Sequence, residues 1–107
     1  MFKKILNCND LWLGEKKGVC VDGVDILLLH TETGIQAFND HCPHANALLS
    51  DGIFCNNTIT CARHGWQFEA CTGKGINPSN VQLRQYPIKI DEAENIWIDI
   101  GIEKCQK

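Results

Sequence analysis

The chain lacks the features that mark several large classes of protein. It contains no run of Lys and Arg, and its formal net charge of −3 argues against a nucleic-acid binder. Its longest apolar stretch, Ile26–Leu29, has the length of a strand and is far too short to span a membrane. The first ten residues contain no apolar run of signal-peptide length. We therefore expect a cytoplasmic protein with no nucleic-acid or membrane partner.

The chain also has little room for complexity. At 107 residues it can form one domain, because a second would have too little core of its own. It shows no linker, repeat or low-complexity segment. It offers no nucleophile–base pair, phosphate-binding loop or acid/base pair of carboxylates that would support catalysis. A single non-enzymatic domain over residues 1–107 is the expectation.

What the sequence does have is short β-like segments at both ends, which predict an all-β fold. Asp22-Gly23 is a strong signal for a tight hairpin turn. The segment 8–14 predicts one short helical turn, with Asn9 or Asp10 as its cap. We expect an antiparallel sandwich or barrel. Its strands are predicted over residues 2–7, 17–21, 24–31, 35–39, 86–90 and 95–100.

The middle of the chain, from about residue 40 to residue 81, has a different composition. It is rich in Gly, Asn, Cys, His and Pro, and only residues 59–61 and 66–69 have the pattern of strands. Some forty weakly patterned residues are unusual in a small domain unless something orders them. A metal could do so, because metal-binding energy is also folding energy. The sequence thus predicts a metal-binding insert over residues 40–81.

Seven cysteines support the same interpretation. An odd number cannot be fully paired in disulfides within one chain. In a reducing cytosol, clustered Cys and His more often bind a metal than form disulfides. For Cys8, Cys20 and Cys55 the expected explanation is the packing of small apolar side chains.

Two motifs in the insert supply the candidate ligands. Cys42-Pro43-His44 has the form C-x-H, and after 16 further residues Cys61-Ala62-Arg63-His64 has the form C-x2-H. Two thiolates and two imidazoles are a full ligand set for a metal, and each spacing lets one loop present both of its side chains. A structural zinc site is the alternative, although zinc modules usually pair C-x2-4-C with H-x3-5-H. The candidate metal- and cofactor-binding residues are Cys42, His44, Cys61 and His64.

These motifs resemble the Rieske iron–sulfur family, and the resemblance extends over the whole chain. Residues 42–52 resemble the first cluster loop of that family and residues 61–68 the second. Thr72-Gly73 and Pro78 resemble the turn and the proline loop that cover the cluster. The resemblance implies the Rieske (ISP-like) fold with an inserted cluster-binding subdomain. It also implies one [2Fe–2S] cluster as cofactor.

The resemblance further implies which iron each pair of ligands binds. Cys42 and Cys61 would hold the buried iron, and His44 and His64 the outer iron nearer the surface. Neutral imidazoles in place of two thiolates make the oxidised centre formally neutral. Such a centre is easier to reduce than a cluster with four cysteines.

Four positions separate the low-potential members of the family from the high-potential ones. High-potential members place two disulfide-forming cysteines where this chain has Ala47 and Arg63, and hydroxyl side chains where it has Trp66 and Phe68. Without those hydrogen-bond donors the reduced cluster is less stabilised. We predict a reduction potential near the low end of the Rieske range, about −150 mV.

This pattern resembles the ferredoxins of bacterial multicomponent oxygenases, most closely those of the toluene monooxygenases. It implies a soluble monomer that carries electrons from an NADH-dependent flavoprotein reductase to the oxygenase component of an aromatic-ring monooxygenase. Gly65 stands where the toluene-system ferredoxin has Leu and dioxygenase ferredoxins commonly have Gly, so a ring-hydroxylating dioxygenase partner stays open.

Two further alternatives fit less well. The Rieske-like small subunits of nitrite reductases commonly lack the ligands that are present here. The cluster domain of a ring-hydroxylating oxygenase would need a catalytic domain, for which 107 residues leave no room.

The roles of a few other residues are left open by the sequence. Trp66 is interpreted equally well as a core residue and as part of a docking face beside His64. Cys71 lies next to the glycine turn, and an approach to the cluster is its less favoured alternative. Packing as small apolar residues is expected for Cys8, Cys20 and Cys55.

Overall fold

The computed structural model describes residues 2–41, 48–63, 65–77, 79 and 81–100. The strands in these residues are β1 (Lys3–Asn7), β2 (Lys16–Val21), β3 (Val24–Thr31), β4 (Gly34–Asn39), β5 (Ile53–Cys55), β6 (Thr58–Thr60), β7 (Gln67–Glu69), β8 (Gly75–Asn77), β9 (Ile88–Ile90) and β10 (Asn95–Ile98). Two 3₁₀-helices, η1 (Cys8–Asp10) and η2 (Leu49–Asp51), complete the described elements. The predicted all-β class is confirmed.

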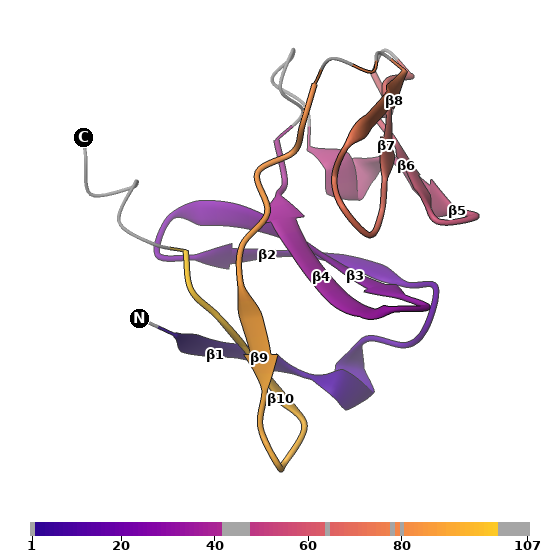
Figure 1. The fold of residues 1–107 in the computed structure, drawn as a ribbon. Coiled ribbons are helices and arrows are strands. Elements are labelled where there is room, and N and C mark those ends of the chain that lie inside the picture. Colours follow the sequence, from indigo (N-terminus) through magenta and orange to yellow (C-terminus); the bar gives the residue numbers. More distant parts are fainter. Residues whose placement is uncertain (1, 42–47, 64, 78, 80, 101–107) are drawn as a thin grey trace.

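The strands form three sheets in which every pair is antiparallel. Their strand orders are β1-β10-β9, β2-β3-β4 and β5-β6-β7-β8. Figure 1 shows the sheet β2-β3-β4 in the middle, with the strands β1, β9 and β10 on one side and the four-stranded sheet on the other. That four-stranded sheet lies within residues 40–81, where the insert was predicted.

The run Ile26–Leu29 explains this layering. All four side chains are fully buried. Because side chains alternate along a strand, Ile26 and Leu28 pack into the core shared with β10, whereas Leu27 and Leu29 pack into the core shared with the four-stranded sheet. A continuous apolar run of this kind is typical of a strand that is covered on both faces.

The first hairpin forms where its turn residues predict it. Asp22 has a φ of 52° and Gly23 a φ of 83°, and Val21 pairs with Val24 across them. Two consecutive residues with positive φ match the twist of a two-residue hairpin, which Asp-Gly favours. The predicted turn is therefore confirmed.

The predicted helical turn also forms, but its cap is a different residue. η1 begins at Cys8, and the side chain of Asn7 accepts a 2.9 Å hydrogen bond from the Asn9 backbone N–H. The prediction of Asn9 or Asp10 as cap was wrong, because both lie inside the helical turn that the cap has to precede.

The closing strands match their predicted alternation except at one position. Tyr86 is buried and Ile88 half-buried, but Ile90 is 46% exposed. Its strand β9 lies at the edge of its sheet, and Ile90 adjoins the turn after it, so no layer covers this end. The alternate isoleucines of the last segment are all buried, as predicted: Ile96, Ile98 and Ile100.

Two strands of the four-stranded sheet were missed by the sequence analysis. β5 and β8 have three residues each, which is too short for a periodic signal. In β5 only Phe54 packs against the core, whereas Ile53 and Cys55 are exposed, so three successive apolar residues give no clear alternation. No helix in the described part of the chain is long and apolar enough to cross a membrane.

Candidate metal centre

Of the four predicted ligands, only Cys61 lies within the described residues. Cys42, His44 and His64 lie outside them. Cys61 follows β6 directly, is 2% exposed, and belongs to the buried core that also contains Leu49. The structure thus places one predicted ligand in a packed core. For the other three it describes the residues that flank them in the sequence.

The second motif sits in a loop that closes tightly on the β6–β7 hairpin. The backbone N–H of Cys61 donates to the carbonyl oxygen of Trp66 at 2.7 Å, and that of Gly65 donates to the carbonyl oxygen of Cys61 at 3.1 Å. Gly65 has a φ of +72°, which glycine adopts without the strain of a side chain. Both ends of the loop are therefore held by its own backbone.

The first motif lies between two residues that face each other. His41 and Leu48 form an antiparallel bridge, and residues 42–47 run between them. One step further out, the Leu49 backbone N–H donates to the Asp40 carbonyl oxygen at 2.6 Å. The Asp40 carboxylate accepts hydrogen bonds from the backbone N–H and the hydroxyl of Ser50, both at 2.7 Å. Burial raises the pKa of this carboxyl, which is 2% exposed, and the Ser50 bonds act against that rise.

The supports of the two motifs also touch each other. Leu49, in η2, is fully buried in the same core as Cys61. Gly52 lies so close to the second hairpin that a Cβ atom there would overlap the Thr60 carbonyl oxygen. Since Thr60 precedes Cys61, this backbone contact brings the segment around η2 beside the start of the second motif.

A third segment completes the surroundings. The predicted turn at Thr72-Gly73 forms, with a φ of +75° at Gly73. Leu83 donates its backbone N–H to the Gly73 carbonyl oxygen and Gly75 donates to that of Val81, both at 2.8 Å. Val81 packs against the core that contains Cys61. Pro78, the predicted proline loop, lies outside the described residues.

The packing role predicted for Trp66 is confirmed, because the residue is half-buried and packs against the core that contains Cys61. Its role in a docking face stays a prediction. Phe68 is fully buried in the same core and carries no hydroxyl group.

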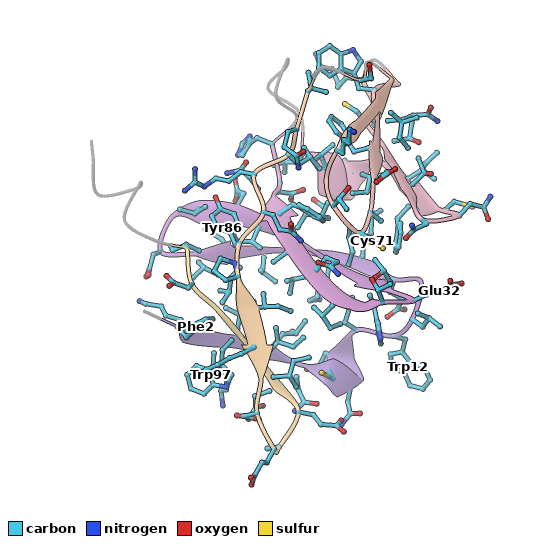
Figure 2. All side chains as sticks on the ribbon, viewed as in Figure 1. Phe2, Trp12, Glu32, Cys71, Tyr86 and Trp97 are labelled. Atoms are coloured by element: carbon cyan, nitrogen blue, oxygen red, sulfur yellow. The ribbon has the colours of Figure 1, made fainter. Side chains whose placement is uncertain are left out.

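Cys71 lies beside Thr33 and Asn57, at the far end of the β6–β7 hairpin from Cys61. Its sulfur is 3.2 Å from the Thr33 hydroxyl oxygen and 3.4 Å from the Asn57 side-chain oxygen, in the space between β3–β4 and the four-stranded sheet (Figure 2). Asn57 is in the β5–β6 turn, at the opposite end of the β6–β7 hairpin from Cys61. The length of the hairpin therefore separates Cys71 from Cys61, and the alternative in which Cys71 approaches the cluster stays an untested prediction.

The packing predicted for the other cysteines holds at one of three positions. Cys8 is half-buried and packs against the core shared with β10, as expected. Cys20 and Cys55 are exposed. Both lie on edge strands, β2 and β5.

The described residues fit a centre with two thiolate and two imidazole ligands. Among the residues that the structure describes, no three His, Cys, Asp or Glu side chains gather into a metal site. However, each predicted ligand loop has fixed ends, and Cys61 is buried where a thiolate ligand is shielded from water. The residue that sequence reasoning missed is Asp40; a carboxylate directly after a strand and two residues before Cys42 was the available signal.

A C-x-H motif and a C-x2-H motif, the second beginning directly after a strand of a small antiparallel sheet, are typical of the class of Rieske proteins. The model of the Rieske [2Fe–2S] domain matches residues 1–87 of this chain. The chain belongs to this family, and its cofactor is one Rieske-type [2Fe–2S] cluster.

Relatives match most of the chain. It is 36% identical over 100 residues to the ferredoxin component of the alkene monooxygenase system of Xanthobacter autotrophicus strain Py2, covering 92% of this chain and 80% of that protein. It is 33% identical over 94 residues to the ferredoxin component of the naphthalene 1,2-dioxygenase system of Pseudomonas putida, covering 87% and 89%. A solved complex of reduced oxygenase and oxidised ferredoxin in carbazole 1,9a-dioxygenase contains a chain that matches with a TM-score of 0.81 at 25% identity, covering 91% of each chain.

Proposed function

We propose that this chain is a ferredoxin that carries single electrons to the oxygenase component of a multicomponent oxygenase, with its cluster held by Cys42, His44, Cys61 and His64. The observation that carries the proposal is the similarity, over most of its length, to ferredoxin components of such systems. The buried Cys61 and the paired ends of the first motif support the ligand set. Following the assignment for this class of centre, the cysteines bind the inner iron and the histidines the outer one.

The residues of this chain contribute rigidity and orientation to that task. When bound, the cluster supplies a centre that accepts and releases one electron. The backbone bonds that close the loop from Cys61 to Trp66 restrain the position of the thiolate in both oxidation states. Leu49 and Phe68 fill the core behind it and exclude water from the inner side. The chain has no substrate of its own in this proposal.

The electron donor in this proposal is an NADH-dependent flavoprotein reductase. The chain would shuttle between the two partners as a monomer in the cytoplasm. A reconstituted assay with NADH, reductase, this protein and an oxygenase tests it: omission of the ferredoxin should abolish coupled oxidation. If the reductase alone supports the same rate, the carrier role is refuted.

The class of oxygenase needs its own comparison. Both an aromatic-ring monooxygenase and a ring-hydroxylating dioxygenase are candidates, since alkene monooxygenase and naphthalene dioxygenase ferredoxins are similar to this chain at 36% and 33% identity. We place the monooxygenase first. Supplying the protein to one representative of each class, under one reductase, tests that order through the ratio of the two turnover rates.

The cofactor ligands are tested on the purified protein. The dithionite-reduced protein should give the EPR signal of a Rieske cluster, and the His64→Ala variant should lose it. As a matched control, His41→Ala should keep the signal, because the His41 side chain is exposed and bonded to Asp25 at 2.9 Å. A colourless protein that contains zinc would favour the structural zinc module instead.

Trp66 is proposed as part of the docking face. Trp66 also packs against the core, so its replacement by alanine would disturb the fold as well as the docking face. The Trp66→Phe variant is a better test than Trp66→Ala, because it keeps an aromatic ring and removes the larger indole. The variant should keep its cluster and deliver electrons to the oxygenase more slowly. Unchanged delivery at limiting ferredoxin would contradict the docking role.

A further inference from the structure

Asp40 and Ser50 form a clamp at the base of the first ligand loop. Asp40 follows β4 directly and Ser50 lies in η2, so the two residues lie on either side of residues 41–49. Both carboxylate oxygens of Asp40 are used: one accepts from the Ser50 backbone N–H and the other from the Ser50 hydroxyl, each at 2.7 Å. The Asp40 backbone oxygen accepts from Leu49 as well.

Strand β2 supports this clamp from outside. The Lys16 ammonium group donates a 2.6 Å hydrogen bond to the Ser50 carbonyl oxygen. Gly18 leaves no free space: a Cβ atom there would lie 2.8 Å from the Ser50 hydroxyl oxygen and 3.0 Å from a carboxylate oxygen of Asp40. A larger residue at Gly18 would therefore push apart the two side chains whose hydrogen bond closes the clamp.

We propose that the Asp40–Ser50 clamp is a positioning device that holds the first ligand loop in its cluster-binding arrangement and so determines how firmly the cluster is retained. This inference rests on the proposed function, because it takes Cys42 and His44 as ligands. Asp40 and Ser50 themselves do not bind iron in it. They act through the loop that they close.

The energetics favour this role. Asp40 is 2% exposed, and a buried carboxylate requires hydrogen-bond partners. Ser50 gives the carboxylate two donors, and the Leu49 N–H bonds to the Asp40 backbone oxygen. Hydrogen bonds to a carboxylate are stronger than those between neutral groups. Fixing both ends of a loop in advance removes most of the entropy that the metal would otherwise have to overcome on binding.

The test is the rate at which purified holoprotein loses its visible absorbance in the presence of an iron chelator. Asp40→Ala should lose the cluster roughly tenfold to a hundredfold faster than the natural protein, the usual effect of removing a residue that orients a metal ligand. Asp40→Asn should stay within about threefold, because its amide accepts the Ser50 N–H and donates to the Ser50 hydroxyl. Asp51→Ala is the matched control, an exposed carboxylate in the same 3₁₀-helix, and should change nothing.

Two further variants disturb the clamp without replacing Asp40. Ser50→Ala removes only the hydroxyl bond and should raise the loss rate less, roughly fivefold. Gly18→Ala leaves both clamp residues in place but should accelerate the loss in the same direction as Asp40→Ala. Far-UV circular dichroism shows which variants keep the fold, and Ser50→Ala decides the matter if Asp40→Ala does not fold.

An independent readout uses amide hydrogen exchange on the holoprotein, compared at equal cluster content. The Leu49 and Ser50 amides should exchange faster in Asp40→Ala than in Asp40→Asn or Asp51→Ala. Equal cluster-loss rates and equal exchange in Asp40→Ala and Asp51→Ala would overturn the clamp while leaving the ferredoxin proposal intact. A natural protein that binds no iron would overturn both.

Discussion

Gly73 offers a sharp test of how the four-stranded sheet packs on the rest of the protein. Its φ is +75°, and a Cβ atom there would lie 2.7 Å from Cε1 of Phe38 and 3.0 Å from Cβ of Leu83. Phe38 belongs to β4 and is fully buried, so it cannot move aside without disturbing the core. Gly73→Ala therefore introduces both backbone strain and a steric overlap.

The matched control is Gly23→Ala. Gly23 has a similar φ of +83°, but nothing lies within 4 Å of the position of its Cβ. Both variants carry left-handed strain of about 1–2 kcal/mol. Only Gly73→Ala adds the cost of overpacking a core, typically about 1–3 kcal/mol. The difference between the two variants isolates that second contribution.

The assay is the melting temperature of the holoprotein by circular dichroism, at one scan rate for all variants. A destabilisation of 1 kcal/mol shifts the melting temperature of a domain near this size by about 4–8 °C, so Gly73→Ala should melt about 10 °C below Gly23→Ala. Equal melting temperatures would refute the close contact between Gly73 and Phe38 on which the packing argument depends.

Three other predictions concern the cofactor and one carboxylate. Cys61→Ser should abolish the visible spectrum and the iron content of the purified protein, because it removes a buried thiolate ligand; a variant that keeps iron would contradict the ligand set. Redox titration should give a potential of about −150 mV, and a value above about +100 mV would contradict a low-potential carrier. The indole N–H of Trp97, followed by the Asn95 backbone N–H, lowers the pKa of Asp91 to about 2, so its stabilising effect is present above the unfolded pKa near 4 and is lost as the pH falls toward 2. Asp91→Asn should lower the melting temperature at about pH 6, and this deficit should shrink below about pH 4; a deficit independent of pH would contradict the assignment.

The parts of the fold that were predictable from sequence depend on local chemistry. Asp22-Gly23 specifies a turn through its own backbone preferences, and the hairpin forms there. The alternation of Ile96 and Ile98 marks a buried face at a period of two, and both are buried. In each case neighbouring residues carry the whole signal, so no knowledge of distant contacts is needed.

The parts that were not predictable depend on contacts between distant segments. The strand around Ile53 depends on its pairing with β6, because only one of its three side chains, that of Phe54, packs against the core. Cys20 is exposed because β2 is an edge strand, a fact about sheet order and not about the residue. The role of Asp40 emerges only when Ser50 and Gly18 are brought beside it.

The candidate site divides in the same way. The motif spacing predicts four ligands, and the family comparison confirms the cofactor. The assignment of Cys42, His44 and His64 stays a prediction, since these residues lie outside the described part of the chain. What the structure adds is the arrangement of Cys61 and of the residues that tie the two loops together, which motif spacing cannot reveal.

The strand that carries Ile26–Leu29 has no solvent side, and this limits how the molecule can be redesigned or can diverge. Ile26 and Leu28 belong to the core shared with β10, and Leu27 and Leu29 belong to the core shared with the four-stranded sheet. The core under the four-stranded sheet includes Leu27, Leu29 and Phe38 from β3 and β4. If the four-stranded sheet were grafted onto another scaffold without these strands, it would therefore expose an apolar surface and lack these three core residues.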